Sequence, residues 1–484
     1  MLRKLGKDVA SYGVGDLALR LVGFLVFPVY AHVLSVEEFG ILALITTGTA
    51  IVALVANPGL NMAMTRYYWD PELTPAMRPL AVSTGLMVLV AWSLTVVLLA
   101  IVGTFPARGL LASRYGAAWM IVLIGLLTIV PEHILQYCLN VVRLQASPWK
   151  FTLVSFFKNV FGIAIGLVLI LGLHQGLRGL FTGALAGALI GAPVALVLIR
   201  GDLLLGFHLA TAKRLLAFGY PFIFAGLAYW MFGSIDRWML AQFCDTTQVG
   251  LYSIAYKFAG VVLFLNGAFG QAWSPFALKL RRDDAGYRTV YARLFSMWFF
   301  FLALAGSTMV LFGDEALRLL TPREYWTAAP ALAPLVMGVV LLGTTQITAI
   351  GISLENKTRL FAAAAWVTAL VNVLLNLLLI PRLAAVGAAL ATFLSYALLT
   401  ALYLFWSQKF HPIPLQRAKL LYSTCLVLLA TSIGMWLSGL GAWSVAGILA
   451  KCALLGLMLA GGVVLGIIDV AQVRALRAWW RTAN

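Results

Sequence analysis

The sequence has few charged residues and few cysteines. Only 11% of its 484 residues are charged, whereas a soluble protein of this length carries about 25%. The four cysteines stand singly, with no CxxC pair and no Cys/His cluster, so neither a disulfide framework nor a zinc site is expected. No GxxxxGK[ST] loop occurs, which argues against ATP hydrolysis by this chain. We therefore expect no metal and no cofactor.

Long apolar segments make up most of the chain instead. Hydrophobic residues account for 62% of the sequence, and runs of about 20 residues or more are long enough to cross a bilayer as helices. This pattern predicts an all-α polytopic membrane protein. We expect fourteen spans, at 9–34, 39–66, 79–104, 116–143, 150–173, 177–200, 217–244, 249–278, 290–313, 328–353, 358–381, 386–408, 419–439 and 442–468.

The basic residues alternate between loops in a way that predicts the orientation. With a cytoplasmic N-terminus, 22 of the 34 Lys and Arg residues fall in cytoplasmic segments, six in outer loops and six within spans. This asymmetry follows the positive-inside rule and places both termini in the cytoplasm. The net charge of +17 is thereby accounted for without a nucleic-acid partner.

The loops are short. The largest outer connection, about 314–327, is too small for a folded domain. A membrane-embedded glycosyltransferase, ligase or polymerase generally carries large outer loops with acidic catalytic residues. We therefore expect no catalytic residues and no enzyme activity.

An internal repeat is suggested by stretches about 210 residues apart. AHVLSVEEFGILAL begins at residue 31 and AQFCDTTQVGLYSI at residue 241. RLQASPWKF (143–151) and SLENKTRLF (353–361) have the same separation, and a ladder of small residues recurs at a separation of 208. Two six-helix repeats of the same orientation typically place a site between two lobes. We expect an N-lobe at 1–210, a C-lobe at 211–412, and two added helices with an interfacial tail at 413–484.

These features resemble the multidrug/oligosaccharidyl-lipid/polysaccharide (MOP) superfamily. YAHVLSVEEFGILAL, from residue 30, and DRWMLAQFCDTTQVGLYSIAYKFAG (236–260) are similar to the two lobe openings of its polysaccharide transporter branch, the Wzx-type flippases. The resemblance implies a MATE-like flippase fold in a bacterial inner membrane. It also implies alternating-access transport of an undecaprenyl-pyrophosphate-linked oligosaccharide for O-antigen, capsule or exopolysaccharide synthesis. Polysaccharide-assembly proteins and a coupling ion, H⁺ or Na⁺, are implied as further partners.

Polar residues inside apolar spans are the candidate site, because charge at bilayer depth is costly and usually faces a cavity. Glu132, Gln136, Asn140 and Arg143 form the longest stripe and indicate either a water-filled cavity or hydrogen bonding between helices. Asp16 and Arg20 share a helical face, as an ion site or as a self-neutralising pair. The candidate substrate contacts are Arg20, Arg66, Arg143, Lys158, Arg237, Lys257, Gln136, Asn140 and Tyr256, and the candidate ion-coupling acids are Asp16, Glu132 and Asp236.

Several of these residues have a second interpretation. Arg66 either guides a pyrophosphate or anchors its helix at the cytoplasmic interface. Lys158 either faces the cavity or extends back to the interface. Asp236 and Arg237, adjacent in sequence, either find partners on other helices or offset each other's cost of insertion.

The sign of the candidate charges separates the functional alternatives. Six cations against three acids favour an anionic substrate, because phosphate binds well to Arg and Lys. A MATE-type multidrug or cation antiporter predicts a cavity dominated by carboxylates and twelve spans. A lipid II flippase is a related alternative, whose signature is not evident in the first span.

Overall fold

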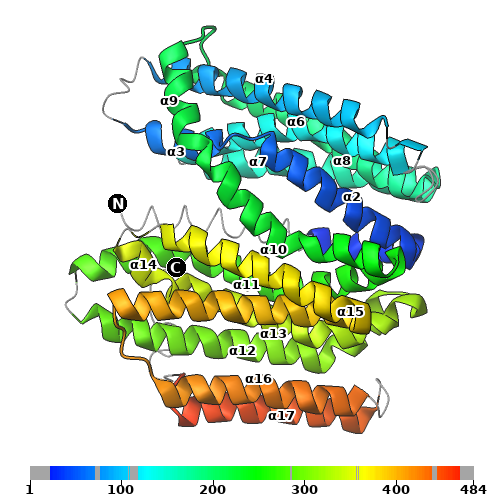
Figure 1. Cartoon of the computed structure of the whole chain (residues 1–484), viewed down its shortest axis with the longest axis vertical. Helices are drawn as coiled ribbons and strands as arrows, with labels where there is room; N and C mark the ends of the chain where they lie inside the picture. The colour runs from blue at the N-terminus through cyan, green and yellow to red at the C-terminus, as the bar shows by residue number, and fades with distance from the viewer. Residues whose placement is uncertain are drawn as a thin grey trace. The chain divides into compact units, whose positions relative to one another are not determined.

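The computed structural model describes residues 22–24, 26–70, 77–106, 108–109, 118–145, 147–283, 286–355, 357, 359–438 and 444–468. These residues are helical with short connections, and no strand occurs among them (Figure 1). The chain divides into two compact units, Met1–Trp238 and Met239–Asn484. The expected lobe boundary at residue 210 falls inside unit 1, within the helix Leu209–Gly219, and the lobe limits remain a prediction.

Unit 1 is a bundle of helices that follow one another in the chain. A short apolar helix at Val22–Val33 comes first. It is followed by α2 (Val36–Val55), α3 (Leu60–Tyr67), α4 (Arg78–Thr104), α6 (Ala118–Leu144), α7 (Pro148–Leu167), η1 (Val168–Gly172), α8 (Gly176–Leu198), η2 (Arg200–Asp202) and α9 (Leu209–Gly219). The next helix, α10 (Pro221–Phe243), begins in unit 1 and runs past its limit at Trp238.

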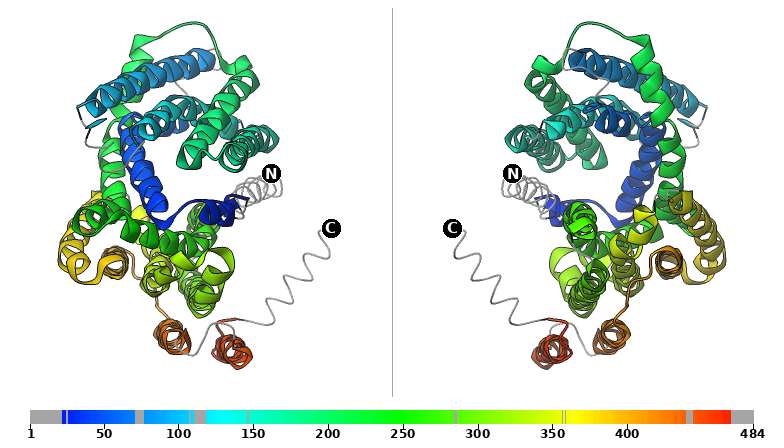
Figure 2. Two further views of the ribbon diagram at one scale, coloured as in Figure 1. Left: turned by 90° about the vertical axis from the view of Figure 1, so that its right-hand side faces the viewer. Right: turned by 90° about the vertical axis from the view of Figure 1, so that its left-hand side faces the viewer.

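Unit 2 has a five-span body with an added helix pair. Its elements are α11 (Thr246–Asp283), α12 (Tyr287–Leu320), η3 (Arg323–Ala328), α13 (Ala329–Thr348), α14 (Ile350–Leu354), α15 (Arg359–Phe410), α16 (Arg417–Ser438) and α17 (Val445–Val464). The last two helices lie side by side, and α16 packs along α12 (Figures 1 and 2).

The described residues contain 11 helices that are long and apolar enough to cross a membrane. The difference from fourteen predicted spans has simple causes. α15 runs through two predicted spans, 358–381 and 386–408, and bends where Ala384 adopts φ 46° shortly after Pro381. α16 corresponds to the predicted span 419–439 but is not among the 11. Much of the first predicted span lies outside the described residues.

The predicted span 39–66 is not continuous. α2 ends at Val55 and α3 begins at Leu60, because Pro58 has no amide hydrogen to donate and Gly59 takes φ 70°. A side chain at Gly59 would overlap the backbone of Gly219. Glycine is therefore required at position 59 for two reasons: the positive φ, and the close approach of the chain leading into α10.

Equivalent helices in the two halves of the expected repeat begin with similar N-terminal caps. Ser35 caps α2 with a capping box, in which its hydroxyl accepts from the Glu38 amide and the Glu38 carboxylate accepts from the Ser35 amide. Asp245 lies 210 residues later and accepts from the Gln248 amide at 2.8 Å where α11 begins. The same local structure therefore recurs at the separation that the sequence suggested.

A second correspondence lies at the tight turns between antiparallel helices. His174 and Ala384 are the non-glycine residues with positive φ in the described part of the chain, at 52° and 46°, and they too are 210 residues apart. After each turn a glycine, Gly179 or Gly387, packs closely against the preceding helix. The residues that these glycines meet are Leu169 and Leu379, again 210 residues apart.

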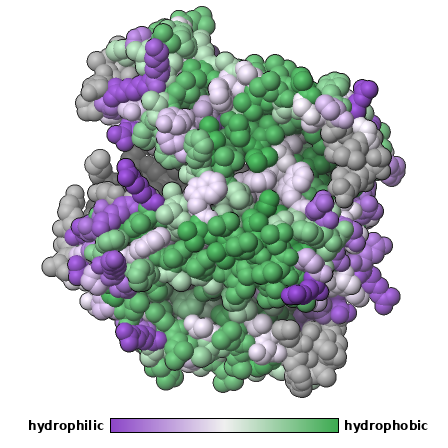
Figure 3. All heavy atoms as spheres, in the orientation of Figure 1, coloured by the Kyte–Doolittle hydropathy of each residue, from purple (hydrophilic) through white to green (hydrophobic). Residues whose placement is uncertain are grey.

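Large apolar side chains cover the outside of the helices. Leu99, Leu370 and Leu457 are 67%, 62% and 70% exposed, as expected for surfaces in contact with lipid rather than water. In Figure 3 the visible flanks of the helices are apolar, and hydrophilic residues gather toward the helix ends. The molecule is a polytopic α-helical membrane protein.

Candidate functional site

A polar strip runs along α6 in unit 1. Glu132, Gln136 and Asn140 are each four residues apart and half-buried, whereas Leu135 and Leu139 between them are buried. Residues at this spacing share one face of a helix. The side chains of the strip contact α3 and α7 of the same unit, so this face of α6 does not meet lipid alone.

Glu132 is the centre of this strip. Its Oε1 atom accepts from Lys158 Nζ at 2.6 Å and from Gln136 Nε2 at 2.8 Å. The two charged side chains remain 28% and 27% exposed. Lys158 on α7 therefore pairs with Glu132 of α6, and its expected place in a cavity remains a prediction.

Small residues on α8 let Lys158 approach α6. A Cβ atom on Gly187 would lie 2.5 Å from the Lys158 carbonyl oxygen, and one on Gly191 would lie 3.1 Å from Lys158 Cβ. Similarly, a Cβ on Gly183 would lie 2.5 Å from Gly166 Cα. The ladder of small residues thus brings the backbones of α7 and α8 together and fixes the position of the Lys158 backbone.

The strip continues from Asn140 onto α3. Asn140 Nδ2 donates to the Asn61 carbonyl oxygen at 3.0 Å, and Thr65 Oγ1 lies 3.2 Å from the same nitrogen. The side-chain amide oxygens of Asn57 and Asn61 are buried and have no hydrogen-bond partner in the described structure. Buried acceptors of this kind normally have a partner, so they are open positions for a ligand or a water molecule.

His133 supports the break between α2 and α3. Trp92 Nε1 donates to the Val55 carbonyl at 2.9 Å, and Ser93 Oγ donates to the Ala56 carbonyl at 2.7 Å. His133 Nδ1 lies 2.9 Å from Ser93 Oγ, inside the unit. The side chains of α4 thereby satisfy carbonyl groups that the helix break releases, and His133 of α6 contacts one of these side chains. This is a structural role for His133.

Two arginines lie at the α3 end of the strip and stack on aromatic rings. The Arg66 guanidinium is 4.8 Å from the centre of the Phe218 ring, and the Arg143 guanidinium is 4.6 Å from that of Phe151. Both arginines are exposed. Stacking orients a guanidinium, and arginine is a residue well suited to binding the oxygens of a phosphate.

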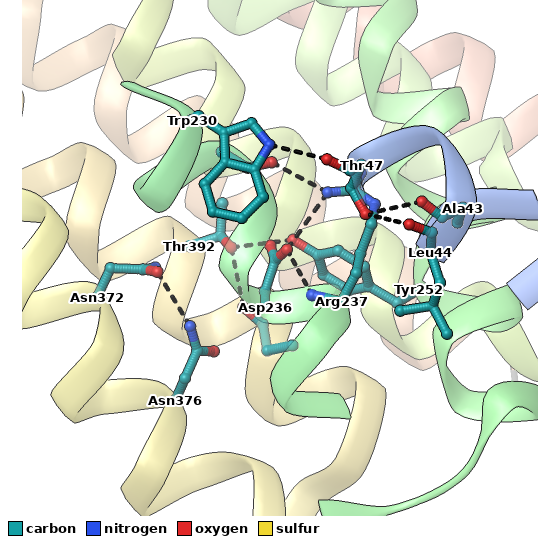
Figure 4. Close-up of polar contacts among 12 residues, drawn as sticks. Ala43, Leu44, Thr47, Trp230, Asp236, Arg237, Tyr252, Asn372, Asn376 and Thr392 are labelled. Carbon is teal, nitrogen blue, oxygen red and sulfur yellow. Dashed lines mark hydrogen bonds and ion pairs between the residues drawn. The ribbon is translucent and has the colours of Figure 1, made fainter. Parts of the chain in front are cut away.

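Asp236 and Arg237 contact each other on α10 (Figure 4). Arg237 Nη1 lies 3.3 Å from Asp236 Oδ1 and donates to the Gly233 carbonyl at 3.0 Å. Both side chains are buried. The adjacent residues therefore form an ion pair, although they do not share a helical face, and their roles in the site remain a prediction. On the same helix, Trp230 donates to the Thr47 carbonyl of α2 at 3.0 Å.

Unit 2 holds Tyr256 and Lys257 on α11, both half-buried. One turn earlier, Tyr252 is fully buried and its hydroxyl lies 3.1 Å from Thr392 Oγ1. Arg237 belongs to unit 1 and Lys257 to unit 2. Their expected contribution to one cationic cavity remains a prediction, and Asp16 and Arg20 lie outside the described residues.

A buried amide cluster lies within α15. Asn376 Nδ2 donates to Asn372 Oδ1 at 3.0 Å, and Asn372 Nδ2 donates to Ser395 Oγ at 3.1 Å (Figure 4 labels the two asparagines). Ser395 belongs to the segment beyond the bend at Ala384. The cluster therefore fastens the two halves of the bent helix together across the bend.

Sequence patterns did not single out the Glu315–Lys451 ion pair. Lys451 Nζ lies 2.5 Å from Glu315 Oε1, and the two side chains are 4% and 8% exposed. The other carboxylate oxygen of Glu315 is buried without a hydrogen-bond partner in the described structure. The available signal was a lone lysine inside the last apolar segment, which needs a partner at that depth.

A second unanticipated cluster surrounds His411, just after α15 ends. Its Nε2 lies 2.8 Å from the Tyr287 hydroxyl, and its Nδ1 lies 3.6 Å from Glu355 Oε1, which Arg281 also approaches. Burial lowers the pKa of His411, and Arg288 and Arg281 lower it further, while Glu355 partly opposes them. The neutral imidazole is the form that this surrounding favours.

No cluster of three or more His, Cys, Asp and Glu side chains suited to a metal ion occurs within the described ranges. The polar atoms of the strip in unit 1 are instead amide groups, one carboxylate and several cations. Such a set suits hydroxyl groups and phosphate oxygens.

Comparison with known proteins relates the chain to polysaccharide biosynthesis proteins. The family described as polysaccharide biosynthesis protein matches residues 5–280. "Lsg locus putative protein 1" of Haemophilus influenzae is 24% identical over 301 residues, which cover 58% of this chain and 68% of that protein. "Probable low-salt glycan biosynthesis flippase Agl15" of Haloferax volcanii is 20% identical over 224 residues, covering 46% and 48%.

Solved structures confirm the fold. The lipid II flippase MurJ in an inward closed conformation superimposes with a TM-score of 0.72 at 15% identity, covering 93% of this chain and 98% of that one. An inward-facing MATE family multidrug transporter of the MOP superfamily gives a TM-score of 0.64 at 14% identity, covering 82% and 94%. The fold is therefore that of the MOP superfamily, as the sequence predicted.

Proposed function

The chain belongs to the polysaccharide biosynthesis protein family, and we propose that it is a flippase for an isoprenoid-pyrophosphate-linked oligosaccharide. The observation that supports this substrate is the strip on α6, where one carboxylate is held by a lysine and exposed arginines lie at one end. The fold is shared with a lipid flippase and with multidrug transporters. The fold therefore does not distinguish an anionic lipid substrate from a cationic drug, and the charges of the site are the basis for the choice.

The strip offers separate groups to the two parts of such a substrate. Arg66 and Arg143 present stacked guanidinium groups to the pyrophosphate, and charge-assisted hydrogen bonds to phosphate are stronger than neutral ones. Gln136, Asn140 and the open Asn61 oxygen offer donors and acceptors to sugar hydroxyls. The lipid tail needs no polar partner and stays in the bilayer.

Lys158 connects substrate binding to a change of charge in the site. A pyrophosphate that reaches the strip competes with Glu132 for the Lys158 ammonium. A carboxylate that loses its cation at this depth favours uptake of H⁺ or Na⁺. Exchange of this kind couples the two bindings with one reciprocal, favourable free energy, so substrate and ion occupy the site together, as in symport; antiport would require them to compete. Asp236 is the second candidate acid, with Arg237 as its cation.

We place this activity in a bacterial inner membrane, with both termini in the cytoplasm, because of the loop charge asymmetry. The substrate then moves from the cytoplasmic to the periplasmic leaflet, where polysaccharide-assembly proteins use it for O-antigen, capsule or exopolysaccharide. The lipid II flippase reading differs only in the glycan carried. The multidrug antiporter reading requires a cationic substrate, which Arg66 and Arg143 disfavour.

Reconstitution in proteoliposomes tests the proposal. A fluorescent undecaprenyl-pyrophosphoryl oligosaccharide is incorporated, and its accessibility to a membrane-impermeant quencher is followed in time. We expect exchange between leaflets in the presence of the protein and none in protein-free liposomes. Transport of cationic dyes in place of the glycolipid would favour the multidrug antiporter. Equal exchange with and without H⁺ and Na⁺ gradients would remove the coupling but leave the flippase.

A further inference from the structure

A shallow hollow of about 640 Å³ lies in unit 2 and shares no residue with the polar strip on α6. It is formed by the end of α12, by η3 and by the start of α13. Its volume is in the range of small-ligand sites. Loop-charge asymmetry predicts that this connection, 314–327, faces the outer side of the membrane. The neighbouring Glu315–Lys451 pair belongs to the packing of α17 and does not line the hollow.

Arg318 is held in position within this hollow. Its Nε atom donates to Asp314 Oδ2 at 3.0 Å, and its guanidinium lies 4.7 Å from the centre of the Trp326 ring. Because the contact with Asp314 uses Nε, both terminal nitrogens keep their donors, and neither makes a hydrogen bond to another described residue. Arg318 therefore lines the hollow with a guanidinium that is held in place and still has donors available on both terminal nitrogens.

Arg323 is the second cation of the hollow. Its guanidinium lies 5.6 Å from the centre of the same Trp326 ring. Trp326 is itself anchored, since its Nε1 donates to the Thr321 carbonyl at 3.2 Å. Within the described residues, Arg323 makes no hydrogen bond and no ion pair. One indole thus positions two guanidinium groups at a single site, and all five donors of Arg323 are open.

Of the two acidic residues of the hollow, Asp314 and Glu324, only Asp314 forms an ion pair with a described arginine. Asp314 is committed to Arg318 and is largely buried, at 12% exposure. Glu324 is exposed on η3 and forms no ion pair with a described residue. A ligand therefore meets donors on Arg318 and Arg323 and one repulsive carboxylate at the rim. Two oriented guanidinium groups match the oxygens of a phosphate.

We propose that this hollow binds a phosphate-bearing group through Arg318 and Arg323, with Trp326 as the platform that orients both. The group is either the headgroup of a lipid phosphate or a soluble pyrophosphate. The proposal rests on the proposed function only for its biological use. On the outer side, such a site would receive the phosphates of a transported lipid before its release.

A local labelling experiment tests this site. Thr327 lines the hollow and is exposed, so Thr327→Cys is reacted with a maleimide in phosphatidylcholine nanodiscs. Mass spectrometry of the labelled peptide separates this cysteine from the four native ones. One arm adds inorganic pyrophosphate to the solution, and the other replaces part of the phosphatidylcholine by phosphatidic acid. Nanodiscs expose both faces, so the result does not depend on the predicted orientation.

We expect one of the two additions to slow labelling, and the arm that does so identifies the source of the phosphate. Arg323→Gln should weaken the protection by about tenfold or more in ligand concentration, since a hydrogen bond to a charged group contributes about 1.5–3 kcal/mol. Glu324→Gln should strengthen the protection. Arg382→Gln, which removes an exposed arginine from another predicted outer connection, should leave it unchanged.

Labelling that neither pyrophosphate nor phosphatidic acid slows would overturn the site and leave Arg318 and Arg323 as interfacial anchors. So would protection that persists in an Arg318→Gln/Arg323→Gln protein. These outcomes are independent of the proposed function, because leaflet exchange is measured separately. A protein that flips no glycolipid but shows protected labelling would refute the flippase and retain the hollow as a phosphate site.

Discussion

The ammonium group of Lys158 lies 2.6 Å from Glu132 Oε1, and Gln136 donates to the same oxygen. Each charged side chain keeps about a quarter of its surface exposed. The pair is therefore neither a buried structural lock nor a solvated surface contact. A partly exposed cation with one carboxylate partner is well suited to exchange that partner for a phosphate.

Removing the cation of this pair should slow glycolipid flipping. We expect Lys158→Gln to reduce the exchange rate by about tenfold or more, because one charge-assisted hydrogen bond to phosphate is lost. The proteoliposome assay measures the rate directly. Lys213→Gln, which removes an exposed lysine of α9 in the same unit, is the matched control and should flip normally. Normal flipping by Lys158→Gln would exclude this lysine from the substrate path.

Neutralising the acid should affect coupling more than binding. With Glu132→Gln, Lys158 has no carboxylate to leave, so pyrophosphate should bind at least as well as in the unmodified protein. Uptake of H⁺ or Na⁺ driven by the substrate should be lost, because the amide does not titrate in this range. Ion flux and glycolipid flipping measured in the same liposomes check this. If ion flux persisted in the variant, Asp236 would become the better candidate.

The arginines at the end of the strip should act on binding. Arg66→Gln and Arg143→Gln are each expected to raise the glycolipid concentration at half-maximal rate by about tenfold, with a smaller effect on the maximal rate. Arg66→Lys should recover only part of this loss, since lysine gives a point charge without the stacked, bidentate geometry of arginine. If Arg66 served only as a positive charge that anchors the helix at the cytoplasmic interface, Arg66→Lys would restore normal flipping.

The Glu315–Lys451 pair should contribute to stability. Replacing one partner, in Lys451→Met or Glu315→Gln, leaves a buried group without its partner and should destabilise the protein by about 3–5 kcal/mol. The double variant Glu315→Leu/Lys451→Met should regain most of that loss, because no charge then remains. Thermal unfolding in detergent reports both effects. Additive losses in the double variant would show that the two residues do not stabilise each other.

Acidification should weaken unit 2 through His411. Its pKa is lowered in the folded protein by burial and by Arg288 and Arg281, so the unfolded chain binds the proton more readily. Stability should therefore fall as the pH drops below the ordinary histidine value of about 6.5. Unfolding temperatures between about pH 8 and pH 5 measure this slope. His411→Gln should flatten it, and an unchanged slope would assign the effect to other groups.

Many features of this protein follow from local sequence. Apolar length alone specifies most of the spans, since a helix is what satisfies the backbone in lipid. The spacing of Glu132, Gln136 and Asn140 predicted one polar face, which the structure confirms. The turns at Ser35 and Asp245 reveal the repeat because capping depends on neighbouring residues. The break at Pro58–Gly59 was also readable in principle, from a residue without an amide hydrogen followed by glycine.

Partners of charged residues were less predictable, because they come from distant parts of the chain. Lys158 has two equivalent interpretations in sequence, and only the close approach of α7 and α8 at Gly187 and Gly191 directs it toward Glu132. The pair of Glu315 with Lys451 joins residues 136 positions apart, which no periodicity connects. The sequence by itself determined the helices, their polar faces and the excess of positive charge. The tertiary structure decided which charges meet, because that depends on how closely helix backbones pack.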